Sequence, residues 1–252
     1  GVPASDPQLQ RALNHLRDAR PKMNYAVALQ TMALCAAEPK RDLALIRENV
    51  KWFETNQLKI GRSKGGWSYP RGGGDNSNTQ FALLALHEAE RVGVPVSDNT
   101  WRIALEHWVS TQNKDGSWGY TPGEAGSGSM TSAGISSVVI ASGRLNEPDV
   151  QLIGGQVRCC GDQASSAVVD NALNWLGRNF SVRNNAGRGN TWLLYNLYGI
   201  ERVGRLTARR FIGEMTTTPT LQQILPGGQS GVLGSPFYAS QLGRWLTNQY
   251  KP

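Results

Sequence analysis

A tryptophan-containing turn occurs twice in this chain, and that repeat constrains the fold more than any other feature. The second copy, QNKDGSW at 112–118, follows an amphipathic stretch over 98–112, and the first, GGW at 65–67, follows a similar stretch over 42–57. Apolar residues in both stretches recur at helical spacing, and the glycine of each turn permits positive φ. Trp67 and Trp118 lie 51 positions apart. Self-similarity at this period predicts an architecture of repeated helical pairs.

Strongly apolar helical patterns alternate with amphipathic ones along most of the chain. Capping residues and Gly or Pro stops bound several of them. The patterns predict a first helix over 8–19 and further helices over 24–37, 42–57, 79–92, 98–112, 130–142, 165–179 and 190–203. The stretch 165–179 is a degraded third copy of the amphipathic member, and 144–163 is predicted to be irregular. In a two-layer arrangement the apolar helices form the inner layer, so we expect an all-α fold.

The composition changes after Arg210. The run TTTP at 216–219 is typical of a linker, and Pro236 is a good first residue for a last helix that ends near Gln249. Trp245 lies on the apolar side of that helix. We therefore predict a repeat domain over 1–213, followed by a linker and a C-terminal tail helix over 214–252.

Composition excludes several classes of protein. The chain has 252 residues, of which 39% are hydrophobic and 18% are charged. These values suit one large or two small globular domains and not general disorder. No apolar run approaches the length of a membrane span.

The net charge of +7 is ordinary for solubility. The arginines near residue 205 lack a nucleic-acid recognition motif, so nucleic acid is not an expected partner. Nothing in the sequence indicates a cellular compartment.

The cysteines and histidines do not form a metal-binding pattern. Cys35 lies in an apolar helical stretch and is expected in the core, whereas Cys159 and Cys160 are adjacent. Closed zinc sites need four ligands at characteristic spacings, and only three histidines are present. We expect neither a metal nor another cofactor.

Three stretches resemble the prenyltransferase and squalene-oxidase repeat family, whose turn is known as the QW motif. They are GGWSYP at 65–70, DNSNTQFALLAL at 75–86 and QNKDGSW at 112–118, and the likeness extends over about 24–213. The stretch 191–213 is similar to a bacterial group of such proteins without a settled activity. This family belongs to the α/α-toroid superfamily, with squalene–hopene cyclases and the β subunits of protein prenyltransferases.

The resemblance implies stacked αα-hairpins of the α/α-toroid type. Closed toroids contain more hairpins than this chain supplies, so we expect a partial, open toroid with an irregular C-terminal tail. Its exposed ends would favour self-association. In the family the glutamine of the turn caps the next inner helix and the tryptophan stacks beside it, which favours a structural role for Gln112 and Trp118.

The stretch DNSNTQ at 75–80 lies where the cyclases carry D-x-D-D-T-A. The middle aspartate of that motif is the general acid that protonates the polyene. Here Ser77 stands in that place and Asn78 follows it. Because a hydroxyl cannot perform this protonation near neutral pH, a cluster of helix N-cap residues is the favoured interpretation. The zinc ligands of the protein prenyltransferases also have no counterpart.

The tail over 224–250 resembles the C-terminal end of penicillin-acylase-type N-terminal-nucleophile hydrolases. Those enzymes carry His and Asp within an S-P-H-Y-x-D-Q pattern, and Phe237 and Ser240 stand there in this chain. The serine nucleophile of such enzymes lies far upstream, and nothing in this sequence matches it.

Two classes of function stay open. The first is a binding or scaffold module that lacks the catalytic acid and takes an apolar or carbohydrate-like ligand on its concave inner surface. Its candidate ligand-binding residues, with the four aromatic ones at the loop rim, are Trp67, Tyr69, Asp75, Asn78, Trp118 and Tyr120. The second is an enzyme, either a diverged terpene cyclase or prenyltransferase relative or a fragment of a penicillin-acylase-type amide hydrolase. The missing acid and the missing nucleophile favour the first class.

Overall fold

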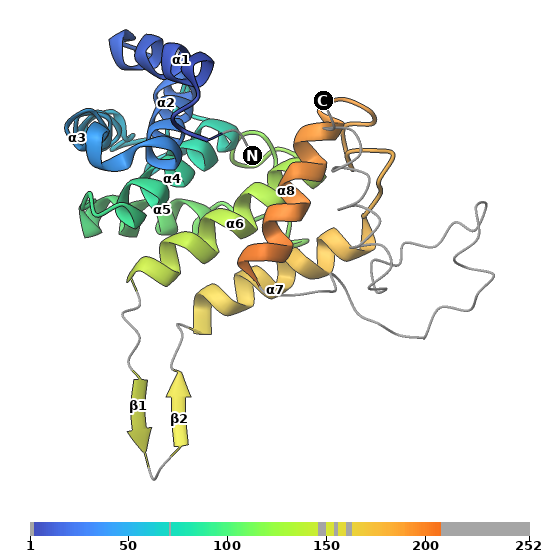
Figure 1. Cartoon of the computed structure of the whole chain (residues 1–252). Helices are drawn as coiled ribbons and strands as arrows, with labels where there is room; N and C mark the ends of the chain where they lie inside the picture. Colours follow the sequence, from blue (N-terminus) through green and yellow to red (C-terminus); the bar gives the residue numbers. More distant parts are fainter. Residues whose placement is uncertain (1–2, 71, 146–149, 154–155, 160–162, 208–252) are drawn as a thin grey trace, which may run out of the picture. The chain divides into compact units, whose positions relative to one another are not determined.

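The described part of the chain is helical, as predicted. The computed structural model describes residues 3–70, 72–145, 150–153, 156–159 and 163–207 (Figure 1). Its helices are α1 (Pro7–Asp18), α2 (Asn24–Ala37), α3 (Pro39–Asn56), α4 (Asn76–Arg91), α5 (Asp98–Ser110), α6 (Gly128–Leu145), α7 (Gln163–Arg178) and α8 (Leu193–Leu206). They lie within a few residues of the predicted ranges. The predicted tail, 214–252, lies outside the described residues.

One element was not expected. Residues predicted to be irregular contain the strands β1 (Val150–Ile153) and β2 (Gln156–Cys159), which pair antiparallel, with Val150 opposite Cys159 and Ile153 opposite Gln156. The physical reason is visible in the sequence, because Gly-Gly at 154–155 separates two short runs that contain β-branched residues. A two-residue Gly-Gly connection is a strong hairpin signal.

The inner helices repeat at a constant spacing. Helices α2, α4 and α6 begin at Asn24, Asn76 and Gly128, so each start lies 52 positions after the previous one. Helix α2 packs against both α3 and α4. The chain divides into two compact units, 1–110 with 140–160 and 111–139 with 161–252, so α6 contributes to both. None of the helices in the described ranges is long and apolar enough to span a membrane.

Large apolar side chains form the core of each unit. In the first unit the fully buried ones come from α2 to α5 and the loop before α4, and they include Leu34, Ile46, Phe53, Trp67, Leu84, Trp101 and Trp108. In the second unit they include Trp118, Ile135 and Leu173. Cys35 is also buried, as predicted, and burial raises the pKa of its thiol to about 11.

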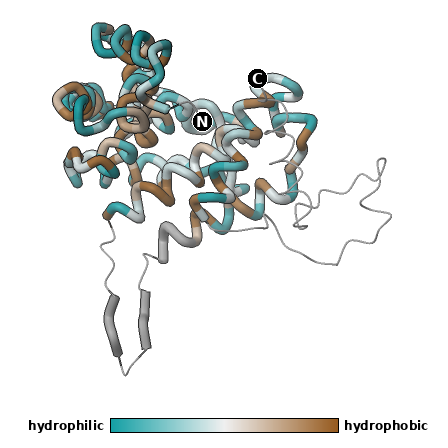
Figure 2. The backbone as a smooth tube through the Cα atoms, viewed as in Figure 1, coloured by the Kyte–Doolittle hydropathy of each residue, from teal (hydrophilic) through white to brown (hydrophobic). Residues whose placement is uncertain are grey.

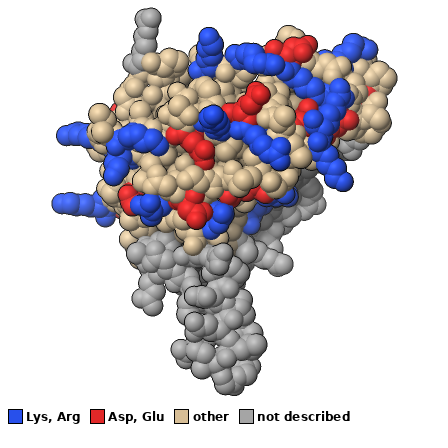
Figure 3. Space-filling model, turned by 90° about the vertical axis from the view of Figure 1, so that its left-hand side faces the viewer, with Lys and Arg blue, Asp and Glu red and all other residues tan. Residues whose placement is uncertain are grey.

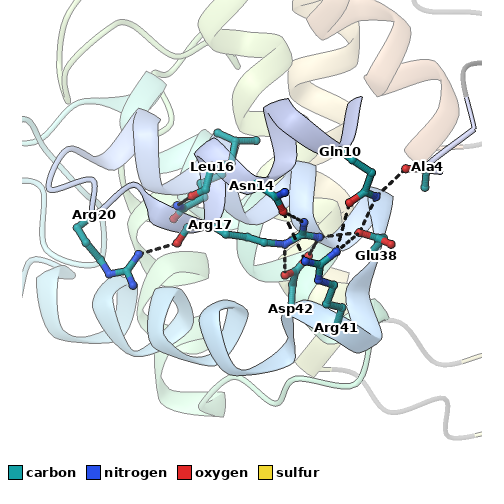
Figure 4. A network of polar contacts seen from close by, with 10 residues as sticks. Ala4, Gln10, Asn14, Leu16, Arg17, Arg20, Glu38, Arg41 and Asp42 are labelled. Atoms are coloured by element: carbon teal, nitrogen blue, oxygen red, sulfur yellow. Dashed lines mark hydrogen bonds and ion pairs between the residues drawn. The ribbon is translucent and has the colours of Figure 1, made fainter. Parts of the chain in front are cut away.

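Helix α1 is largely hydrophilic (Figure 2) and is held by polar contacts. Arg17 donates hydrogen bonds to both oxygens of Asp42, at 2.7 and 2.9 Å, and one to Glu38 at 2.7 Å (Figure 4). Gln10 also donates to Glu38, at 3.0 Å. These hydrogen bonds, from Gln10 first and then from Arg17, hold the pKa of Glu38 below its ordinary value. The network ties α1 to the start of α3.

Candidate functional site

The first tryptophan turn connects three helices of the first unit. The side-chain amide of Gln57 donates to the carbonyls of Gly65 and Thr100, both at 3.0 Å, and so joins the turn to α5. The indole N–H of Trp67 donates to the carbonyl of Phe53 at 2.9 Å. Trp67 is only 1% exposed. The ring of Trp67 is therefore enclosed by protein and is not exposed to solvent.

The second turn has the same construction in the second unit. Gln112 donates to the carbonyls of Gly116 and Val168, at 3.0 and 2.9 Å, which joins the turn to α7. Trp118 is fully buried, and a Cβ at Gly134 would lie 2.4 Å from its ring. The expected structural roles of Gln112 and Trp118 are thus confirmed.

The predicted partner of the glutamine was wrong, however. The resemblance implied that Gln112 caps the next inner helix, which here is α6. Instead, the bonds that Gln57 and Gln112 donate go to carbonyls of their own turns and of α5 or α7. The reason is that an acceptor from the next partner helix lies beside each turn. Both glycines have positive φ, +89° at Gly65 and +93° at Gly116, and a Cβ at these positions would lie 2.0 and 2.5 Å from carbonyl oxygens of those helices, so the turns approach them closely.

The inner helices are attached to the tryptophans through their first turns. The backbone N–H of Trp67 donates to the hydroxyl of Thr79 at 3.1 Å, and the N–H of Asp75 donates back to the Trp67 carbonyl at 3.1 Å. The second unit repeats this exchange. Trp118 donates to the Thr131 hydroxyl at 3.3 Å, and its carbonyl accepts from Ser127 at 3.0 Å.

The predicted cap at the start of α4 is confirmed. Asp75 is 6% exposed, and one of its carboxylate oxygens accepts from the backbone N–H of Asn78 at 2.8 Å and from the hydroxyl of Ser77. The other oxygen accepts from the side-chain amide of Asn78 at 2.7 Å. Three donors therefore point at this carboxylate. The arrangement stabilises the free amides of a helix N-terminus.

Neutral polar side chains of α2 and α5 also form hydrogen bonds with the first turn of α4. The side-chain amide of Asn24 donates to the carbonyl of Asn78 at 2.8 Å, which links α2 to α4. The Nε2 atom of His107 lies 2.9 Å from the side-chain oxygen of Asn76. Burial lowers the pKa of His107 to about 4, opposed in part by a backbone hydrogen bond at Lys64. His107 is therefore uncharged near neutral pH.

Three aromatic rings gather beside the N-terminal ends of α2 and α4. The ring of Tyr25 lies 6.1 Å from that of Tyr69, nearly parallel to it, and 4.4 Å from that of Phe81. Tyr69 is 44% exposed, and Tyr25 and Phe81 are half-buried. We call these three residues the aromatic cluster. Tyr69 was predicted from the sequence, whereas Tyr25 and Phe81, which belong to different helices, were not.

An apolar stripe continues from the cluster along α2. Its residues are half-buried or exposed and share one side of the helix; they are Tyr25, Leu29, Met32, Ala33 and Ala36. Leu29 is 53% exposed, and α2 contains no charged residue. The α2 stripe and the aromatic cluster together form a partly exposed, uncharged surface. Such a surface can accept an apolar ligand, or the flat face of a sugar on its rings.

The six predicted site residues fall in both units. Trp67, Tyr69, Asp75 and Asn78 lie in the first, and Trp118 and Tyr120 lie in the second. Tyr120, 37% exposed, follows Tyr69 by the same 51 positions that separate the two tryptophans. Trp67 and Trp118 were expected at the exposed loop rim, but both are buried. Within the described ranges, no group of three His, Cys, Asp or Glu side chains could hold a metal ion.

Charged residues are interspersed on the outer face drawn in Figure 3. Among the charged residues of the described chain, Arg91 pairs with Glu88 at 3.0 Å and Arg41 pairs with Glu38 at 3.3 Å, in both cases three positions apart. Exposed pairs of this kind contribute little to stability. The face shown is of mixed charge.

Comparisons with known proteins find a likeness in fold to a solved structure and a likeness in sequence to a family model. The structure of ent-copalyl diphosphate synthase from Streptomyces platensis matches with a TM-score of 0.55 and 17% sequence identity, over 76% of this chain and 34% of that one. The chain thus spans about a third of that enzyme, and at this identity the likeness shows a terpene-cyclase-like α/α-toroid fold alone. A family model for penicillin amidase matches residues 154–252, which include the predicted stretch 224–250. No curated protein matches.

Proposed function

We propose that this chain is a binding or scaffold module on a terpene-cyclase-like fold, related to the prenyltransferase and squalene-oxidase repeat proteins and without their catalytic acid. The observation that supports this proposal is the arrangement of side chains at the start of α4. Ser77 stands where the cyclases have their acid, and its hydroxyl donates to Asp75. The carboxylate of Asp75 is engaged as a helix cap by three donors. Protonating an alkene demands a strong acid within reach of the substrate, and this cluster supplies none.

The proposed ligand is a small apolar or carbohydrate-like molecule that lies on the aromatic cluster and the α2 stripe. Tyr69 would contact it directly, while Asp75 and Asn78 hold the end of α4 beside it. Tyr120 would have the corresponding role in the second unit. Trp67 and Trp118 would support these loops from within the core. The absence of charge from α2 favours a neutral ligand.

Product analysis tests the loss of catalysis. The protein is incubated with squalene and with shorter polyprenyl diphosphates, and cyclic products are sought by mass spectrometry. We expect no product above a heat-killed control. A product that disappears in Asp75→Asn would contradict the proposal and would identify an enzyme.

A binding measurement tests the proposed surface. Decanol and maltotriose serve as apolar and carbohydrate probes, titrated against the intrinsic fluorescence of the protein. We expect one of them to bind, with at least tenfold weaker binding in Tyr69→Ala. The control is Ile60→Ala, which removes an 85% exposed apolar side chain of the same unit outside the cluster. Equal affinities in the two variants would contradict this site.

The penicillin amidase match favours one alternative, an amide hydrolase fragment. Such an enzyme would cleave the side-chain amide of a penicillin, and its nucleophile would come from outside the residues that match. The assay measures release of the side-chain acid from benzylpenicillin. We expect no release by this chain, and release at a rate proportional to protein concentration would support the hydrolase instead.

A further inference from the structure

The first tryptophan turn contains a loop whose two ends are joined by backbone hydrogen bonds. The N–H of Leu58 donates to the carbonyl of Gly66 at 2.9 Å, and the carbonyl of Leu58 accepts from the N–H of Gly65 at 2.8 Å. The stretch KIGRSK at 59–64 lies between these ends. We call residues 59–64 the basic loop. Ser63 is buried, so the loop is anchored on one side.

The second tryptophan turn closes with the same pair of bonds and fewer residues. The N–H of Asn113 donates to the carbonyl of Ser117 at 2.9 Å, and the carbonyl of Asn113 accepts from Gly116 at 2.9 Å. Two residues, 114–115, lie between these ends, compared with six in the basic loop, a difference of four. Both turns bury their tryptophan and connect their glutamine to a partner helix. The four additional residues are therefore not required for the construction of the turn.

The additional residues stand out from the first unit. Ile60 is 85% exposed, and a Cβ at Gly61 would have nothing within 4 Å. The carbonyl of Gly61 accepts from the N–H of Lys64 at 3.1 Å, which holds the loop in a turn. A single exposed isoleucine is ordinary on a protein surface. Here, however, it is part of an insertion that also carries several charges of one sign.

The basic loop contains three cations and no acid. Lys59, Arg62 and Lys64 are exposed, and the sequence over 57–74 has neither Asp nor Glu. Among the described residues, no carboxylate forms an ion pair with any of the three. The ammonium group of Lys59 instead lies 3.3 Å from the backbone carbonyl of Glu54. The positive charge of the loop is thus complementary to an anionic surface.

We propose that the basic loop docks this protein on an anionic phospholipid surface. Ile60 enters the boundary between the headgroups and the acyl chains, and the three cations lie among the phosphates. An isoleucine on a protruding loop suits a deformable lipid surface, whereas a protein partner would need a pocket shaped for it. Each basic residue close to an anionic membrane strengthens binding about fivefold. This docking is independent of the proposed ligand surface on α2.

The test is sedimentation of the full-length chain with lipid vesicles. One set of vesicles contains phosphatidylcholine alone, and the other contains phosphatidylcholine and phosphatidylglycerol. The loop variants are Ile60→Ser and Arg62→Ser. The matched controls are Val182→Ser, which removes a 44% exposed apolar side chain, and Lys114→Ser, which removes an exposed cation of the second turn. Far-ultraviolet circular dichroism verifies that the variants are folded, as expected because all four side chains are exposed.

Docking predicts binding to the vesicles with phosphatidylglycerol and little to those without it, and weaker binding at high salt. Binding should weaken about tenfold in Ile60→Ser, through loss of apolar burial, and about fivefold in Arg62→Ser. Both control variants should bind like the unchanged protein.

Three results would overturn the proposal. The first is equal binding to both sets of vesicles, or to neither. The second is an equal effect of Arg62→Ser and Lys114→Ser, because the net charge and not the basic loop would then cause the attraction. The third is binding to polyglutamate, weakened in Arg62→Ser, without binding to either set of vesicles, which would identify an acidic protein as the partner of the loop.

Discussion

At the scale of single residues, the turn glycines determine how closely the repeats approach one another. A Cβ at Gly65 would lie 2.0 Å from the carbonyl oxygen of Ile103, whereas Gly61, with φ of +81°, has nothing within 4 Å. Gly61→Ala should therefore cost only the backbone strain, about 1–2 kcal/mol. Gly65→Ala should cost clearly more, because the turn must also move away from α5. Urea unfolding measures both, and equal losses would contradict the close approach.

His107 should make stability depend on pH. The folded pKa of about 4 lies below the ordinary 6.5, so the unfolded chain binds more protons between these values. Stability should consequently fall as the pH drops from 6.5 towards 4, by up to about 3 kcal/mol. Unfolding free energies at several pH values should give a flatter profile for His107→Gln than for the control His15→Gln. Identical profiles would mean that His107 is not buried as an uncharged group.

The residue types of the site were predictable, but their neighbours were not. Asp75 could be recognised as a cap because the signal for capping is local in sequence. The aromatic cluster joins Tyr25 to residues 44 and 56 positions later, and the packing of α2 on α4 brings them together. His107 illustrates the same limit, since its contact with Asn76 connects two helices. A single sequence contains no signal for such pairs.

At the scale of elements, α1 should depend on its ion pairs. The side chains of Arg17 and Asp42 are 13% and 5% exposed, so Arg17→Met leaves a buried carboxylate without its partner. We expect a loss of about 3–5 kcal/mol in the unfolding free energy. Arg41→Met is the control, because the Arg41 side chain is 53% exposed. Its pair should contribute less than about 1 kcal/mol. A similar small loss in both variants would show that α1 is held by other contacts.

Helices were easier to predict than their connections. The periodicity of apolar residues located α2 to α8 because each helix buries one side over many residues. The β1–β2 hairpin was missed because two four-residue strands give only a weak periodic signal, although Gly-Gly at 154–155 indicated the turn. The glutamine bonds were assigned to the wrong element because the acceptors lie on helices that follow 43 and 56 positions later.

At the scale of the whole molecule, two likenesses to known proteins overlap in one chain. The terpene-cyclase-like match covers 76% of it and the penicillin amidase match covers residues 154–252, so part of the chain lies in both. The amidase likeness therefore extends well upstream of the stretch 224–250 that the sequence suggested. The predicted boundary between 213 and 214 stays a prediction, since it lies beyond the described residues. The likeness to a terpene cyclase shows a fold, and a fold alone does not establish a function.

The constant step between inner helices has a consequence for how the gene can change. Because α2, α4 and α6 start 52 positions apart and the last two are joined to a tryptophan by the same pair of bonds, one repeat is a natural unit of duplication or loss. In-frame recombination between neighbouring copies would preserve every junction when it adds or removes a whole step. A change of length between a tryptophan and the threonine that follows it would disturb this pair of bonds. Insertions and deletions that preserve the fold are thus expected to comprise whole repeats.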